Sequence, residues 1–128
     1  MVRNGRKDRK PLFFVGSSRG DLSSFPKEVK EVTGFALHQA QMGEKHVDAK
    51  PLKGFGGASV LEIVEDYDGD TYRAVYTVRF ADAVYLLHAF QKKAKKGIAT
   101  PKQDIDLVKE RLKGAEEHYA KWSKPKEK

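Results

Sequence analysis

The chain begins with short apolar and polar segments that predict a strand followed at once by a helical turn. Four consecutive apolar residues at positions 12–15, closed by Gly16, are enough for a buried strand and too few for a helix. Ser17 or Ser18 can then cap a short helical turn that runs to Phe25. We therefore expect the ordered part of the chain to start with β structure.

A longer helix is predicted from Lys27 to about Met42. Its apolar side chains recur at helical spacing along one face, and charged side chains lie mostly elsewhere. Pro26 suits the first helical position because its missing N–H is not needed there, and Gly43 is a natural stop. Residues 44–59, with one proline and three glycines, are expected to be a connection.

Three strands are predicted next, joined by connections too short for crossover helices. They are Val60–Glu65, Tyr72–Phe80 and Ala83–Phe90. Asp68 and Gly69 supply a hairpin turn between the first two. Strict alternation places Tyr72, Tyr76 and Phe80 on one face of the second strand, whereas the third strand is apolar on both faces. The pattern predicts an antiparallel meander.

The last element is a helix from about Pro101 into the low 120s, with Thr100 as its cap and Asp104 and Asp106 near its positive end. Its apolar residues follow steps of three and four and form one stripe: Ile105, Val108, Leu112, Ala115, Tyr119 and Trp122. We expect this stripe to pack on the domain's own sheet, and the groove of a partner is the alternative. The fold class is therefore α+β.

Length and composition indicate one domain with two charged ends. The 128 residues fit a single core over 11–123, flanked by a disordered basic arm at 1–10 and a disordered tail at 124–128. The chain has no cysteine, which excludes disulfide scaffolds and cysteine zinc sites. No apolar run approaches the roughly 20 residues of a membrane span, and the charged residues 1–10 are not followed by the apolar core of a secretory signal, so we expect none. We expect a cytoplasmic protein that does not bind membranes.

The net charge of +7 is unevenly distributed. Residues 1–10 carry a net charge of +4, residues 11–91 carry −3, and residues 92–128 carry +6. The net charge changes abruptly at Lys92. This change indicates either that the protein binds a polyanionic partner or that its basic end is a flexible segment that increases solubility.

Side chains for metal, cofactor or nucleophilic chemistry are few. The four histidines show no HxxxH or HExxH spacing, so a metal site is not expected. The glycines at 54–57 lack the lysine and the strand-to-helix context of a phosphate-binding loop, and the chain has no cysteine nucleophile. We expect no cofactor.

A basic cluster is the strongest chemical signal. The third predicted strand carries His88 and Gln91 and passes directly into Lys92, Lys93, Lys95 and Lys96. Arg73 lies on the neighbouring strand, and the planar fork of its guanidinium suits a phosphate. Lys50 and Lys53, in the preceding loop, can face the same groove. The simpler interpretation is that these lysines are exposed to solvent at the point where the strand ends.

Several of these motifs together resemble a known family. The motifs that carry the resemblance are Lys50-Pro51-Leu52-Lys53-Gly54, Leu61-Glu62-Ile63, Tyr72-Arg73-Ala74-Val75-Tyr76, Leu87-His88-Ala89-Phe90-Gln91-Lys92-Lys93, and Thr100-Pro101 ahead of Ile105-Asp106. In these motifs the chain resembles phage-derived HigB-like toxins of the RelE/ParE superfamily, over about residues 11–113. The resemblance implies a strand, two helices, a three-stranded antiparallel meander and a C-terminal helix, which agrees with the pattern above.

The resemblance also implies a function. It indicates the toxin of a bacterial type II toxin–antitoxin system, a metal-independent, ribosome-dependent endoribonuclease that cuts translated mRNA and is neutralised by a helix-turn-helix (HigA-like) antitoxin. Such a site must promote attack of a ribose 2′-OH on the adjacent phosphate. Arg73 would stabilise the phosphorane, and Lys92 or Lys93 would serve as base or acid. The RNA-binding candidates are Lys50, Lys53, Gln91, Lys95 and Lys96.

His88 remains open between two roles. Its ordinary pKa, near 6.5, suits proton transfer. Alternation, however, places it on the face of Val84, Leu86 and Phe90, so a buried structural histidine is the other interpretation.

One departure from the family pattern keeps other functions open. Relatives commonly carry a basic residue in the strand where this chain has Glu62 and Glu65. A carboxylate there repels phosphate unless it acts as the base. The alternatives are a gyrase-inhibiting toxin of the ParE type and a catalytically silent relative that binds a regulator.

Overall fold

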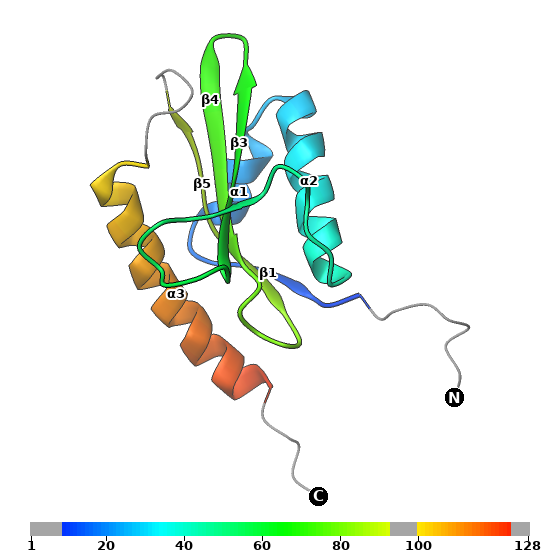
Figure 1. Cartoon of the computed structure of the whole chain (residues 1–128), viewed down its shortest axis with the longest axis vertical. Coiled ribbons are helices and arrows are strands. Elements are labelled where there is room, and N and C mark those ends of the chain that lie inside the picture. Colours follow the sequence, from blue (N-terminus) through cyan, green and yellow to red (C-terminus); the bar gives the residue numbers. More distant parts are fainter. Residues whose placement is uncertain (1–8, 93–99, 124–128) are drawn as a thin grey trace, which may run out of the picture.

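The structure, a computed structural model, describes residues 9–92 and 100–123. A five-stranded sheet forms its centre, in the order β1-β5-β4-β3-β2 (Figure 1). The strands are β1 (Leu12–Phe14), β2 (Lys50–Pro51), β3 (Val60–Tyr67), β4 (Asp70–Thr77) and β5 (Val84–Lys92). The helices are α1 (Ser18–Ser23), α2 (Lys27–Gln41) and α3 (Lys102–Trp122). The predicted α+β class and the order of its main elements are confirmed.

The sheet contains the predicted meander and one strand that was not predicted. Strands β3, β4 and β5 pair antiparallel in sequence order, and β1 adds to β5 in parallel. The two-residue strand β2 pairs antiparallel with β3. The expectation that residues 44–59 are only a connection was therefore wrong at 50–51. A proline and nearby glycines are typical of a loop, so the sequence does not indicate so short an edge strand.

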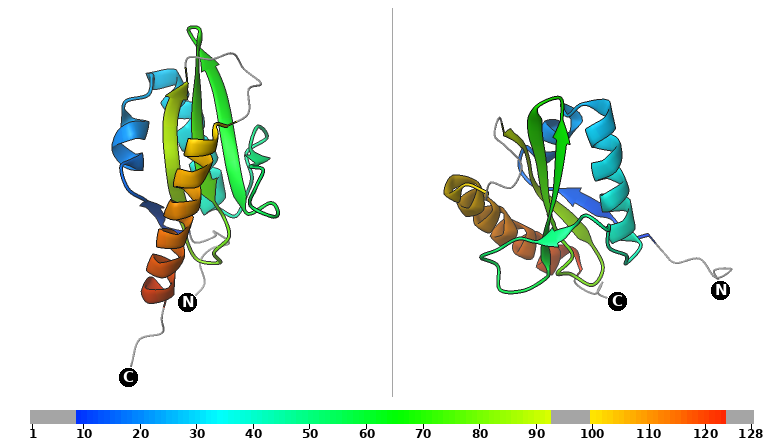
Figure 2. Two further views of the ribbon diagram at one scale, coloured as in Figure 1. Left: turned by 90° about the vertical axis from the view of Figure 1, so that its left-hand side faces the viewer. Right: turned by 45° about the horizontal axis from the view of Figure 1, so that its top comes forward.

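The helices cover both faces of the sheet (Figure 2). Helix α2 packs on one face through Ala36, Leu37 and Ala40, which contact side chains of β3 and β4. Helix α3 packs on the other face through the predicted stripe, with Val108, Leu112 and Ala115 buried. The prediction that α3 covers its own sheet is confirmed. Within the described residues, no helix is long and apolar enough to cross a bilayer.

A β-bulge in β5 changes which side chains face α3. Val75 pairs with His88 but Tyr76 pairs with Leu86, so Leu87 is an extra residue in the ladder. Leu87 packs with the α3 cluster, and the next residue, His88, also bonds to α3. A bulge breaks strict alternation. The prediction that His88 shares a face with Val84 and Leu86 was therefore wrong.

The second meander strand ends earlier than expected. Strand β4 stops at Thr77, where a hydroxyl-to-backbone bond to Ser59 closes the ladder. Phe80 lies in the following loop and stacks on Tyr119 of α3, with ring centroids 4.6 Å apart. Phe80 therefore belongs to the α3 face and not to the face of Tyr76, as alternation had predicted.

Candidate functional site

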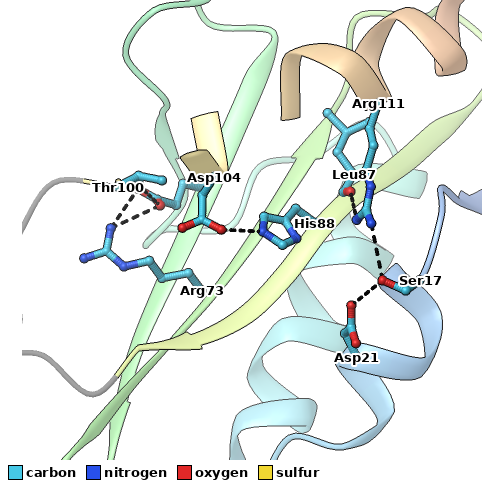
Figure 3. Close-up of polar contacts among 9 residues, drawn as sticks. Ser17, Asp21, Arg73, Leu87, His88, Thr100, Asp104 and Arg111 are labelled. Carbon is cyan, nitrogen blue, oxygen red and sulfur yellow. Dashed lines mark hydrogen bonds and ion pairs between the residues drawn. The ribbon is translucent and has the colours of Figure 1, made fainter. Parts of the chain in front are cut away.

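Arg73 is the centre of a buried polar cluster on the α3 face of the sheet (Figure 3). Only 4% of its surface is exposed. Its Nη1 atom lies 3.0 Å from the hydroxyl oxygen of Thr100 and 3.3 Å from Oε2 of Glu62. The Thr100 hydroxyl donates to the same Glu62 oxygen at 2.6 Å. A cation, a carboxylate and a hydroxyl are thus held within hydrogen-bonding distance.

The hairpin between β3 and β4 brings Arg73 and Glu62 together. Asp68 and Gly69 both have positive φ, 53° and 85°, as a type I′ turn requires. That turn fixes a register in which Val64 pairs with Arg73 and Glu62 with Val75. Because alternate residues share a face, Glu62 and Arg73 are diagonal neighbours on the α3 side.

Two lysines predicted to belong to the site flank this cluster: Lys50 as an RNA-binding residue and Lys92 as a base or acid. Lys50 is exposed and pairs with Glu62 across β2 and β3. Lys92, at the end of β5, pairs with Thr71 and so shares the face of Arg73. The structure therefore places a lysine at each side of the Arg73 cluster.

Of the other predicted RNA-binding residues, the structure describes Lys53 and Gln91. Lys53 is exposed in the turn after β2. Gln91 is exposed and donates from Nε2 to Asp70 Oδ2 at 2.6 Å. Lys93, Lys95 and Lys96 lie outside the described residues.

His88 forms a second polar pair beside the first cluster. Its Nε2 atom lies 2.8 Å from Oδ1 of Asp104 on α3, and the two side chains are 8% and 16% exposed. Its ring stacks on Phe90, with centroids 4.4 Å apart, and Phe90 pairs with Arg73 across the sheet. The start of α3 therefore contributes a partner to each polar group. Thr100 contacts Arg73 and Glu62, and Asp104 contacts His88.

Comparisons with known proteins agree with this architecture. The family described as phage-derived protein Gp49-like (DUF891) matches residues 20–113. The chain belongs to this family. No curated protein matches it.

Two solved structures are similar to the chain. A double mutant of the Escherichia coli toxin RelE in the free state superposes with a TM-score of 0.51 at 17% identity, covering 83% of this chain and 97% of RelE. The toxin–antitoxin complex RelBE2 of Mycobacterium tuberculosis gives a TM-score of 0.45 at 21% identity, covering 70% of this chain and 98% of the matched one. The predicted phage-derived family and RelE-like fold are confirmed; the HigB-like branch stays a prediction.

Two residues of the site were missed as partners in the sequence. Thr100 was expected to cap α3, but Pro101 occupies the cap position and the Thr100 hydroxyl turns to Glu62 and Arg73. Asp104 was assigned only to the helix dipole, yet it is the partner of His88. The hairpin turn sets the strand register, so it could have shown that Glu62 and Arg73 are diagonal neighbours. The contacts of Thr100 and Asp104 depend on how α3 packs on the sheet, which the sequence does not show.

The cluster suits acid–base chemistry and electrostatic stabilisation. Arginine keeps its charge at every physiological pH, and a carboxylate beside it can accept a proton from a substrate hydroxyl. Among residues 9–92 and 100–123, no group of three or more histidine, aspartate or glutamate side chains is arranged to hold a metal ion.

Proposed function

We propose that this protein is the toxin of a bacterial type II toxin–antitoxin pair and acts as a ribosome-dependent endoribonuclease on translated mRNA. The observation that carries the proposal is the buried Arg73, held against Glu62 and Thr100 between Lys50 and Lys92. A RelE-like fold and a phage-derived family support it. The toxin would work in the cytoplasm, with the ribosome, mRNA and a helix-turn-helix (HigA-like) antitoxin as its partners.

The reaction is a transfer within the RNA. The ribose 2′-OH gives its proton to the Glu62 carboxylate, and its oxygen attacks the adjacent phosphorus. The Arg73 guanidinium stabilises the negative charge that develops on the phosphorane. The bond from phosphorus to the 5′ oxygen then breaks, and that oxygen takes a proton from Lys92 or Lys93. The products are a 2′,3′-cyclic phosphate and a free 5′-OH.

The remaining candidate residues would bind the RNA or hold other parts of the site in position. Lys50, Lys53, Gln91, Lys95 and Lys96 would contact the RNA. His88, also a candidate for proton transfer, has its Nε2 bonded to Asp104 and its ring buried. This geometry supports its structural role, which keeps β5 and α3 together beside Arg73.

One contact supports the alternative of a silent relative. The charge of Arg73 is already matched by Glu62 in the free protein, so a phosphate must compete with that carboxylate for the guanidinium. A protein in which this ion pair persists would bind nucleic acid without cutting the strand, or would bind a regulator.

Growth after induction in bacteria tests the proposal. Wild-type protein should arrest growth and create new 5′ ends in translated mRNA, and Arg73→Ala should abolish both. Arg79→Ala is the matched control, because Arg79 pairs with Glu116 at the other end of the sheet and should leave toxicity unchanged. Arg73→Lys keeps the charge and guards against simple unfolding; circular dichroism checks the fold of each variant.

Three results would contradict the proposal. Normal growth at verified wild-type expression counts against any toxin and favours the silent relative. DNA breaks without new RNA ends favour the ParE-type gyrase inhibitor. Equal toxicity of a folded Arg73→Ala variant removes the assigned phosphate site.

A further inference from the structure

The bulge in β5 decides which face of the sheet the end of this strand presents. After the bulge, Phe90 pairs with Arg73, and paired residues of antiparallel strands share a face. Lys92 lies two residues further along β5, so it is on this face as well. It is a diagonal neighbour of Arg73, roughly 7 Å away, which a long side chain can span. Arg73 and the lysine proposed as proton donor are therefore neighbours.

Without the extra residue, β5 would present the opposite side chains beyond Leu87. Strict continuation of the pairing that precedes the bulge would set Ala89 opposite Arg73. Lys92 would then pair with Asp70 and lie on the α2 side of the sheet. A shift of one residue exchanges the two faces of a strand, because side chains alternate along it. The position of Lys92 beside Arg73 thus depends on the bulge.

Arg111 of α3 bonds to the main chain of the extra residue. Its Nη1 atom donates to the carbonyl oxygen of Leu87 at 2.9 Å (Figure 3). Leu87 is completely buried, and a buried carbonyl needs a donor because water does not reach it. The extra residue of a bulge interrupts the regular ladder of hydrogen bonds. A donor from outside the sheet therefore stabilises the bulged strand over the regular one.

The turn between β1 and α1 fixes the guanidinium of Arg111. The Nη2 atom lies 3.3 Å from the hydroxyl oxygen of Ser17, and that hydroxyl donates to Oδ2 of Asp21 at 2.7 Å. Gly16 has φ of +58°, and a Cβ at this position would lie 2.9 Å from the guanidinium. A planar fork of donors can bridge two acceptors in this way, whereas a lysine ammonium is a single point. Arg111 is thus held rigidly against the bulge.

The pair of His88 and Asp104 depends on the same bulge. In strict register His88 would pair with Ala74 and point away from α3, so its bond to Asp104 would be lost. This bond joins side chains, and it involves the residue after the bulge. Arg111, by contrast, bonds to the backbone at the extra residue, where the bulged strand differs from a regular one.

We propose that Arg111 is a positioning residue of the candidate site. Its bond to Leu87 keeps the bulge formed, and the bulge keeps Lys92 beside Arg73. This inference rests on the proposed function, in which Lys92 gives a proton to the leaving 5′ oxygen. In this role Arg111 does not touch the RNA, since both of its terminal nitrogens bond to the protein.

Nuclear magnetic resonance on the free protein tests whether Arg111 holds the bulge. Nuclear Overhauser contacts between β4 and β5 report which residue lies opposite Arg73. The wild type should show contacts with Phe90, whereas Arg111→Ala should weaken these and add contacts with Ala89. Lys109→Ala is the matched control, because it removes one positive charge from an exposed position of the same helix and should keep the wild-type contacts.

Two milder variants repeat this test if Arg111→Ala does not fold. Ser17→Ala removes the second bond of the guanidinium, and Arg111→Lys keeps the charge but not the fork. Each should shift the contacts from Phe90 towards Ala89, and less than the alanine variant does. Wild-type contacts in every folded variant would overturn the inference.

Cleavage of ribosome-bound mRNA under single-turnover conditions tests the effect on the reaction. Arg111→Ala should lower the rate by about 10²-fold, the order of loss that a small misplacement of a reacting group causes. Arg111→Lys should recover part of it, and Lys109→Ala should match the wild type. Adding Lys92→Ala to Arg111→Ala should cost nothing more, because that lysine has already left the face of Arg73. Losses that multiply, or a Lys92→Ala protein as fast as the wild type, would overturn the inference.

The two measurements separate this inference from the proposed function. If the wild type does not cut mRNA, the proposed function fails, while a changed register in Arg111→Ala keeps Arg111 as the residue that holds the bulge. An unchanged register overturns the inference even in an active nuclease. A loss confined to ribosome binding, with a smaller salt dependence, would make Arg111 a phosphate contact and would also overturn it.

Discussion

His88 Nε2 lies 2.8 Å from Asp104 Oδ1, and this bond joins the first turn of α3 to the part of β5 that follows the bulge. Thr100, four residues earlier, makes the equivalent connection to Arg73 and Glu62. The start of α3 is therefore held at two points of one sheet face. A change at either point should loosen the helix where the proposed phosphate site is built.

Loss of the Asp104 carboxylate should destabilise the fold. Asp104→Ala leaves His88 Nε2 without its acceptor, and a buried polar group without a partner costs about 1–3 kcal/mol. Urea unfolding should show a drop of that size in the free energy of unfolding. Asp106→Ala is the control in the same helical turn, since Asp106 is exposed and its ion pair with Lys102 lies on the surface. A similar loss in both variants would mean that the contact with His88 contributes nothing specific.

Gly16 and Gly20 should respond to alanine with opposite signs. Gly16 has φ of +58°, and an added Cβ would lie 2.9 Å from the guanidinium of Arg111. Gly16→Ala should therefore lower the free energy of unfolding by about 1–2 kcal/mol, the cost of this backbone region for an L-residue. Gly20 lies in α1 with open space around it, so Gly20→Ala should raise stability by up to about 1 kcal/mol. Thermal unfolding of the two variants measures both; a stabilised Gly16→Ala protein would contradict the conformation of the β1–α1 turn.

The buried Tyr76 hydroxyl should make the fold sensitive to alkali. Burial raises the pKa of Tyr76 from 10.0 to about 12. Between these values the unfolded chain has lost the proton and the folded chain keeps it, so stability falls as pH rises. A two-unit difference corresponds to about 2 kcal/mol lost between pH 10 and pH 12.

Tyr76→Phe isolates this effect. The Tyr76 hydroxyl has no hydrogen-bond partner among the described residues, so the substitution should cost little at pH 8. Denaturant unfolding at pH 8 and pH 11 should show a smaller decline for the variant than for the wild type. Parallel declines would show that other groups cause the alkaline loss.

The sequence predicts the fold well because most of its elements are determined locally. The 3.6-residue apolar period of α2 and α3, the Asp68-Gly69 turn and the closely spaced strand signals each specify their element without distant contacts. The failures lie where tertiary structure decides. Strand β2 exists only because β3 lies beside it, and the bulge at Leu87 depends on the pairing of β4 with β5.

The candidate site is predicted less completely for the same reason. Arg73 stands out from the sequence because a charged residue is unusual inside a sheet. The sequence does not show the environment of Arg73. Thr100 lies 27 residues later in the chain, and it contacts Arg73 because of how α3 packs. The sequence presents Glu62 as an obstacle to phosphate unless it acts as the base, but it does not show that Glu62 is the direct partner of Arg73.

Glu62→Gln distinguishes a general base from a simple counter-charge. If Glu62 accepts the 2′-OH proton, the amide should lower the rate of cleavage of ribosome-bound mRNA by about 10²–10⁴-fold and remove the acidic limb of its pH profile. If Glu62 only neutralises Arg73, the substitution should free the guanidinium and raise the rate. Glu65→Gln is the control: Glu65 pairs with Tyr72 and belongs to the other face of β3, so its rate should match the wild type. An unchanged rate for Glu62→Gln would contradict both roles and place the base elsewhere.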